Sequence, residues 1–165
     1  MSASPSRTIS KLIIVLALAT IVLTSGWLPD PVASHFGPSG LANGYMTRFG
    51  YLLFMAGIAV GVPTLLSLMI GGAIRRSADS VNIPNRDYWV APARRDGTVD
   101  YLIDHTARLA AGVALFAVAL HFVLVRANGL TPPRLEGTSF VAALTGALVG
   151  VGIWVAALLR RFRLP

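Results

Sequence analysis

Three histidines, His35, His105 and His121, are the side chains of this sequence that titrate near neutral pH, and the chain has no cysteine. An imidazole can carry a proton, act as a general base or bind a metal ion, so the spacing of the three decides what they could do together. His105 and His121 would lie roughly 24 Å apart along a shared helix axis, too far to bind one ion. His35 falls in a segment that we expect on the opposite side of a membrane from His105. The sequence therefore predicts no metal site and no cofactor.

His121 is the one ionisable residue inside an uncharged stretch long enough to cross a membrane. A histidine in that setting is a candidate for binding a ligand or handling a proton. The alternative is structural, with a neutral imidazole that hydrogen bonds to a hydroxyl or carbonyl of a neighbouring helix. We favour the structural role, for which the candidate hydroxyl partners are Thr20, Thr24, Ser25 and Thr145.

Common catalytic signatures are missing from the chain. It has no H-E-x-x-H zinc motif, no G-x-S-x-G nucleophile turn, no Walker A loop and no dinucleotide-binding glycine pattern. The sequence therefore favours a protein that is not an enzyme.

The elements that must position these residues follow from the distribution of charge. Only 13% of the residues are charged, against roughly 25% in a soluble globular protein. Four windows without Asp, Glu, Lys or Arg come close to the roughly 17 to 25 residues that cross a hydrocarbon core. They predict an all-α membrane protein, a single domain over residues 1–165, with transmembrane helices at 12–28, 50–74, 108–126 and 138–159.

The basic residues predict the orientation of these helices. Eleven of the fourteen Lys and Arg fall before the first helix, between the second and third, or after the fourth. The positive-inside rule then places both termini and the segment 75–107 in the cytoplasm, and the segment 29–49 outside. This topology accounts for the formal net charge of +7, so nucleic acid is not predicted as a partner.

The first apolar window could also be the core of a signal peptide, because Arg7 and Lys11 form a plausible basic region before it. No clear small-x-small cleavage site follows at the right distance. We therefore expect an uncleaved helix that ends before Pro29, with Trp27 at the membrane interface.

Small residues recur at four-residue spacing inside two of the predicted helices. Such stripes let another helix approach closely, and packing within one bundle is the expected use, with a dimer interface as the alternative. Pro63 removes a backbone hydrogen bond, so a kink is expected near it. The stripes consist of Gly57 and Gly61 in the second helix, and of Ala142, Gly146 and Gly150 in the fourth.

The predicted cytoplasmic segment contains a turn-rich run, "NIPNRDYW", which ends in two adjacent aromatic residues suited to the headgroup region. Either partner or substrate binding, or a structural interfacial cap, would explain it, and we favour the cap. A helix is expected to begin at Pro92 or at Thr98 and to run into the third span. Its four-residue spacing predicts that Asp104 pairs with Arg108.

The predicted external segment, "LPDPVASHFGPSGLANGYMTRFG", is longer than an unstructured connection usually is. "PVASHF" has strand character, "GPSG" is a turn, and "LANGYM" can return as a second strand with Asn43 and Gly44 near its bend. The segment therefore predicts a small β-hairpin on the outer face.

"LPDPVASHFGPSGLANGY" resembles the signature of a bacterial family of small multi-pass membrane proteins that is catalogued as a domain of unknown function. The signature runs proline-x-x-[IV]-x-x-H-[FW]-x-x-x-G-x-x-[DN]-G. The same domain opens proteins similar to the SdpI immunity protein of a toxin system. "NIPNRDYW" with "APARR" resembles a second motif found in short members of the family. The residues that carry the first signature are Pro29, Val32, His35, Phe36, Gly40, Asn43 and Gly44.

This resemblance implies a multi-pass protein of the bacterial cytoplasmic membrane. We expect a non-enzymatic recognition, immunity-like or signalling module whose hairpin meets a peptide, lipid or envelope component outside. A cytoplasmic protein partner would then contact the segment 82–108. The alternative is a membrane enzyme or transport accessory protein acting on a lipid-like or small substrate. The candidate binding residues are Asp30, His35, Phe36, Asn43, Tyr45, Asn82, Pro84, Asn85, Asp87, Tyr88, Trp89 and His121.

Overall fold

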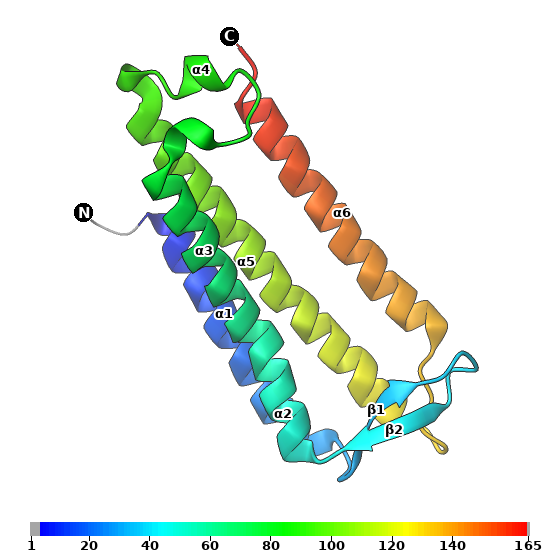
Figure 1. Cartoon of the computed structure of the whole chain (residues 1–165). Coiled ribbons are helices and arrows are strands. Elements are labelled where there is room, and N and C mark those ends of the chain that lie inside the picture. The colour runs from blue at the N-terminus through cyan, green and yellow to red at the C-terminus, as the bar shows by residue number, and fades with distance from the viewer. Residues whose placement is uncertain (1–3, 165) are drawn as a thin grey trace.

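The computed structural model describes residues 4–164, which form a mostly helical protein with a two-stranded hairpin between its first two long helices (Figure 1). Within these residues, four helical stretches are long and apolar enough to cross a membrane. They are Pro5–Trp27, Arg48–Arg76, Pro92–Asn128 and Gly137–Arg161. The predicted fold class, an all-α membrane protein with a small hairpin, is confirmed.

The first stretch is helix α1, Pro5–Thr24, extended by a short 3-10 turn at Ser25–Trp27. The second is interrupted, because α2, Arg48–Ala56, is joined to α3, Val62–Arg76, by a π-helical segment at Gly57–Gly61. The irregularity expected near Pro63 therefore takes the form of a π segment that ends before it. Pro63 itself follows the π segment, in the first turn of α3.

Helix α5, Pro92–Asn128, begins at the first of its two predicted starts, and α6, Gly137–Arg161, follows it. A short helix α4, Arg86–Trp89, precedes α5. Figure 1 shows the start of α1 and the end of α6 on the side of the bundle away from the hairpin, as four crossings require. The two sides are called the hairpin end and the termini end below.

The hairpin pairs β1, Val32–Phe36, with β2, Ala42–Met46, in an antiparallel ladder with two register shifts. The prediction that Asn43 and Gly44 lie near its bend was wrong, because both are inside β2 and Gly44 pairs with His35. A Cβ atom on Gly44 would lie 2.9 Å from the Cβ atom of His35. This glycine is therefore required by the close approach of the two strands and not by a turn.

The hairpin is tied to the bundle by the last residue of α5. The side-chain amide of Asn128 accepts a hydrogen bond from the Ala33 N–H (2.8 Å) and donates one to the Ala33 carbonyl (3.0 Å). On the other strand, the N–H of Ala42 donates to the carbonyl of Pro133 (3.1 Å). Strand edges that would otherwise be unpaired are thereby satisfied by α5 and by the loop that leads to α6.

Near the hairpin, a core of buried side chains joins α1, α2, α5 and β1. A second cluster lies near the termini end, where α3 and α5 meet the residue that follows α6. The first contains Ile21, Leu28, Val32, Tyr51, Met55, Ala59 and Ala117, and the second contains Ile74, Ile83, Leu102, Ile103 and Phe162.

Helix α6 packs mainly against α5, and none of its residues is buried. A Cβ atom added to Gly57, Gly61, Gly146 or Gly150 would meet nothing within 4 Å. The expectation that the small-residue stripes bring helices into close contact within the bundle was therefore wrong. The stripe of α6 instead lines an open groove beside α5, because α6 is held mainly near its two ends.

Gly40 offers a direct test of how the hairpin is joined to the loop before α6. It has a φ of +80°, and a Cβ atom there would lie 2.8 Å from the carbonyl oxygen of Leu135, whose N–H donates to the Gly40 carbonyl. Gly40→Ala should lower the free energy of unfolding in mixed micelles by roughly 1 to 3 kcal/mol. The matched control is Gly146→Ala, which meets no atom. Equal stability of the two variants would contradict this account of the loop.

Candidate functional site

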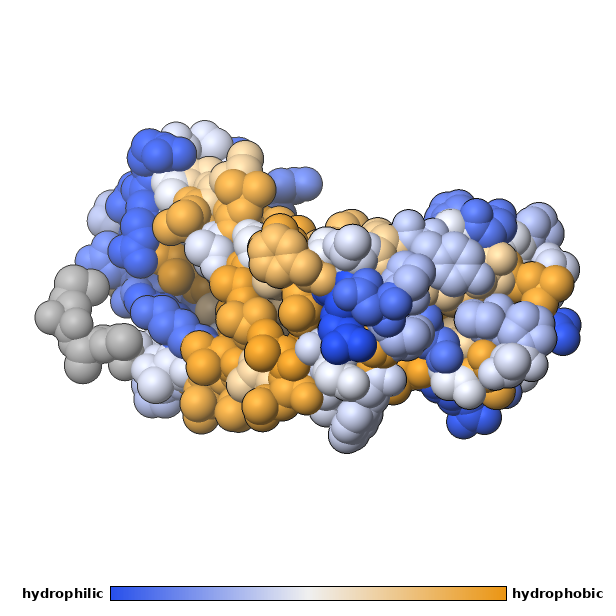
Figure 2. Space-filling view, turned by 90° about the horizontal axis from the view of Figure 1, so that it is seen from below, coloured by the Kyte–Doolittle hydropathy of each residue, from blue (hydrophilic) through white to orange (hydrophobic). Residues whose placement is uncertain are grey.

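A pocket of about 410 Å³ lies where the hairpin meets α2 and α5. We call it the hairpin pocket. Seen from the hairpin end, the hairpin region shows mostly hydrophilic and neutral surface, and the bundle beside it is largely hydrophobic (Figure 2). By its lining residues, the pocket lies between the hairpin and the bundle. It is lined by Ser34, His35, Gly44, Tyr45, Met46, Tyr51, Phe54 and Leu124.

Two of the predicted binding residues, His35 and Tyr45, meet in this pocket. His35 and Tyr45 come from the paired strands β1 and β2, and both are exposed. Tyr51, from the first turn of α2, also lines the pocket, although only 1% of its surface is exposed. Aromatic rings with polar tips, next to an imidazole, can bind a ligand that has both apolar and hydrogen-bonding groups.

Tyr51 connects the hairpin pocket to the buried imidazole of His121, which is fully inaccessible to solvent. The Tyr51 hydroxyl lies 2.7 Å from Nδ1 of His121, and the Thr24 hydroxyl lies 2.8 Å from Nε2. These three side chains, from α2, α5 and α1, are called the His121 cluster below.

The hydrogen-bond pattern assigns the tautomer of His121. Thr24 Oγ1 already donates to the carbonyl of Thr20 (2.6 Å), so it accepts the N–H of Nε2. Nδ1 of a neutral imidazole then accepts the proton of the Tyr51 hydroxyl. Both nitrogens are occupied by the protein, which supports the structural role predicted for this histidine, and Thr24 is one of its four predicted partners.

The other predicted residues near the hairpin lie outside the pocket lining. Asp30 accepts a hydrogen bond from the backbone N–H of Arg48 (3.1 Å), and Thr47 caps the same helix start by accepting from Gly50 (3.1 Å). Asn43 is exposed, and Phe36 pairs with Ala42 in the ladder. Asp30 thus helps to begin α2, close to Tyr51.

At the termini end, the "NIPNRDYW" run meets the end of α6. The side-chain amide of Asn85 (2.9 Å) and the indole N–H of Trp89 (3.1 Å) both donate to the carbonyl of Phe162. Asn85 adopts a left-handed backbone, with φ of 53°. The run therefore supplies two donors to the carbonyl of Phe162, the residue that follows α6, where helix-end carbonyls lack partners within the helix. This supports the interfacial cap that the sequence favoured.

The remaining candidates of that run are Asn82, Pro84, Asp87 and Tyr88. Tyr88 stacks under the Arg94 guanidinium, with 3.8 Å between its ring centroid and Cζ, and Asp87 pairs with Arg86 at 3.0 Å. Asn82 is exposed and Pro84 is half-buried. Asn85, Asp87 and Tyr88 line a shallow depression of about 280 Å³ on this surface.

The predicted pairing of Asp104 with Arg108 was wrong. Asp104 accepts hydrogen bonds from Arg7 and from the Ser4 hydroxyl (2.6 Å), while Asp100 also pairs with Arg7 (3.0 Å). The start of α1 lies close enough to α5 to supply a better-placed cation than the neighbour one turn along the helix. Arg108 is left with a hydrogen bond from its Nε to the Ser6 hydroxyl (3.1 Å).

The sequence analysis missed Tyr51, Asn128 and the pairing of His105 with Trp154. In that pair, His105 Nε2 donates to the Trp154 carbonyl (3.1 Å), and the Trp154 indole donates to the His105 carbonyl (2.9 Å). Each partner is far away in the chain, so no local spacing could have revealed it. Within residues 4–164, no group of three or more metal-binding side chains is present.

The fold and the site define a multi-pass membrane protein with a hairpin pocket on one face. Residues 12–60 match the family described as Domain of unknown function (DUF1648). This range covers most of α1, the hairpin and the start of the second span. The hairpin signature lies within this matched region. No curated protein and no solved structure matches the chain.

The His121 cluster predicts a measurable loss of stability. Tyr51→Phe leaves Nδ1 of His121 without a donor in a buried site, and should lower the free energy of unfolding by about 1 to 2 kcal/mol. Tyr45→Phe is the control, because its ring is exposed and 54% accessible. In a double-mutant cycle with His121→Leu, the cost of Tyr51→Phe should largely disappear. Additive costs would show that the two side chains do not interact.

Proposed function

We propose that this protein is a non-enzymatic, immunity-like or signalling module of the bacterial cytoplasmic membrane that recognises a ligand outside the cell in its hairpin pocket. The observation that carries the proposal is the meeting of His35 and Tyr45 with buried Tyr51 in one cavity. The resemblance of the hairpin signature to SdpI-like proteins supports the same role.

The chemistry of the pocket favours an amphipathic ligand. The rings of Tyr45 and Phe54 and the side chain of Leu124 offer apolar contact, while His35 and Tyr45 bring polar atoms to the rim. A peptide with an apolar side chain, a lipid or an envelope component would satisfy both. The His35 imidazole can donate or accept a hydrogen bond at that rim.

The His121 cluster supports transmission from this pocket. A ligand that shifts Tyr51 must disturb its hydrogen bond to His121, which in turn bonds to Thr24 of α1. Three of the helical stretches would then respond to one contact. An enzyme or transport accessory protein that used His121 would need a free nitrogen on that imidazole, and both of its nitrogens are already hydrogen bonded, which favours the recognition role for the hairpin pocket.

Photocrosslinking tests the recognition role. p-Benzoylphenylalanine in place of Tyr45, in cells that express the protein, should form adducts with an envelope molecule identifiable by mass spectrometry. The same group in place of Phe49, which is 69% exposed and outside the pocket, is the matched control. His35→Ala should remove the adducts specific to position 45. Identical adducts at both positions, or adducts that His35→Ala leaves unchanged, would contradict a ligand in the hairpin pocket.

Orientation has a separate test. The excess of arginine at the termini end predicts that the hairpin faces outward. A cysteine in place of Ser39, in the hairpin turn, should react with a membrane-impermeant maleimide in intact cells. A cysteine in place of Ser80, in the segment between α3 and α4, should react only after the cells are opened. The reverse pattern would place the hairpin pocket in the cytoplasm.

A further inference from the structure

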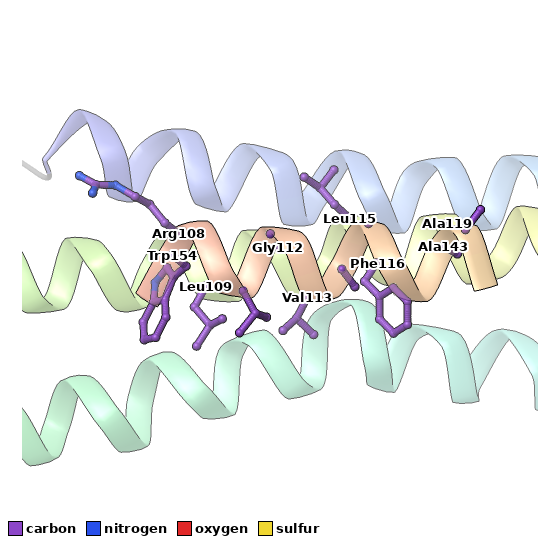
Figure 3. Close-up of a pocket in the computed structure, with 14 residues that line it drawn as sticks. Arg108, Leu109, Gly112, Val113, Leu115, Phe116, Ala119, Ala143 and Trp154 are labelled. Atoms are coloured by element: carbon purple, nitrogen blue, oxygen red, sulfur yellow. The ribbon is translucent and has the colours of Figure 1, made fainter. Parts of the chain in front are cut away.

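Two apolar grooves run along α5 from a single arginine at the termini end. One groove, of about 470 Å³, lies between α5 and α6, and Figure 3 shows Arg108 and Trp154 at one end of it. The other, of about 510 Å³, lies between α5 and α1. We call them the α6 groove and the α1 groove. The residues that line both are Arg108, Gly112 and Leu115.

The ridge between the two grooves is low at Gly112. A Cβ atom on Gly112 would meet nothing within 4 Å, so the bare backbone of α5 separates the grooves one turn away from Arg108. The walls of the α6 groove are shaped by the small residues of α6, among them Gly146 and Gly150. The grooves therefore converge at Arg108, from which each runs toward the middle of the bundle.

Arg108 carries a charge that no carboxylate neutralises directly. Within residues 4–164, it forms no ion pair, and its hydrogen bond is the one from Nε to the Ser6 hydroxyl. Asp104, one turn away, is held by Arg7 and Ser4. The guanidinium carbon, Cζ, lies 5.9 Å from the ring centroid of Tyr101, and the terminal nitrogens have no hydrogen-bond partner within these residues. They can therefore bind an anion, and a guanidinium matches the oxygens of a phosphate well.

We propose that Arg108 and the two grooves bind one anionic diacyl phospholipid, with its phosphate at Arg108 and one acyl chain in each groove. A diacyl lipid presents one charged group above two apolar chains joined at a single point. The site presents one cation above two apolar channels that share a ridge. Basic sites between transmembrane helices bind anionic headgroups by the same combination of charge and apolar contact.

Charge also argues against a second copy of this chain as the occupant. Arg108 belongs to α5, and three more arginines lie in the last turn of α6 or just after it: Arg160, Arg161 and Arg163. A symmetric pairing across the α6 groove would bring these arginines toward their own counterparts, with Asp100 and Asp104 already engaged by Arg7. A phospholipid supplies the missing negative charge and is present at the surface of every bilayer.

The test is a titration of the full-length protein in neutral detergent, followed by native mass spectrometry. The probes are dioleoylphosphatidylglycerol, dioleoylphosphatidylcholine and the single-chain lysophosphatidylglycerol. We expect one phosphatidylglycerol to bind with an affinity at least about tenfold above that of phosphatidylcholine. The single-chain lipid should bind more weakly than the diacyl lipid of the same headgroup.

Two variants separate the charge from the grooves. Arg108→Gln should reduce the affinity for phosphatidylglycerol by about tenfold and that for phosphatidylcholine by less, because the choline group offsets the charge of its phosphate. Arg160→Gln, outside both grooves, should change neither affinity. Gly112→Leu should weaken both diacyl lipids by raising the ridge. Its control is Gly152→Leu, since a Cβ atom at that exposed position of α6 also meets nothing. Unchanged thermal unfolding confirms that each variant is folded.

Several outcomes would overturn the proposal. They are equal binding of the two diacyl lipids, equal loss in Arg108→Gln and Arg160→Gln, and single-chain binding as strong as diacyl binding. A dimer that disappears in Gly112→Leu, without selective lipid binding, would assign the grooves to a second copy of the chain instead.

Discussion

The structure depends on how the imidazole of His121 is satisfied in an apolar interior. No bulk water is available inside a bilayer to hydrogen bond to it, so the protein must supply both partners. Tyr51 and Thr24 do so, and they come from two different helices. One side chain of α5 thereby sets the positions of α1 and α2 relative to each other. The segment that joins α1 to α2 packs against the same core through Leu28, which precedes the hairpin, and Val32 in β1.

The same requirement explains how the hairpin is attached. Its backbone lies at an interface where exposed strand edges would be costly or prone to pairing elsewhere. Asn128 and the loop before α6 pair with those edges. The hairpin is therefore part of the helix bundle and not a mobile loop above it. A cavity between the hairpin and α2 can then keep a defined shape, as a specific binding pocket requires.

Helix α6, in contrast to α1 and α2, has no buried residue and is attached to the bundle mainly near its two ends. It is held near the termini end by the reciprocal His105–Trp154 pair and by the cap on the Phe162 carbonyl, and at the hairpin end by the loop. Between these attachments its small residues leave a groove beside α5. Apolar surfaces gain no hydrophobic free energy from pairing within lipid, so such a gap is tolerated in a membrane although it would be costly in water. Helix α6 is thus attached to the bundle by hydrogen bonds near its two ends, and an accessible apolar surface lies between them.

The sequence by itself determined that this is a membrane protein, that it has four membrane-spanning helices and that a hairpin joins the first two. These depend on local composition, on the runs without charge and on the turn residues, all of which can be read along the chain. It also indicated His35 and Tyr45 as candidate residues, and it favoured the structural cap for the Asn82–Trp89 run.

The tertiary structure decided which side chains meet. Asp104 pairs with Arg7 and not Arg108, Tyr51 joins His121, and the small residues of α6 border a groove. Such contacts join residues that are tens of positions apart, and they depend on the rotation and spacing of whole helices, which no local spacing encodes.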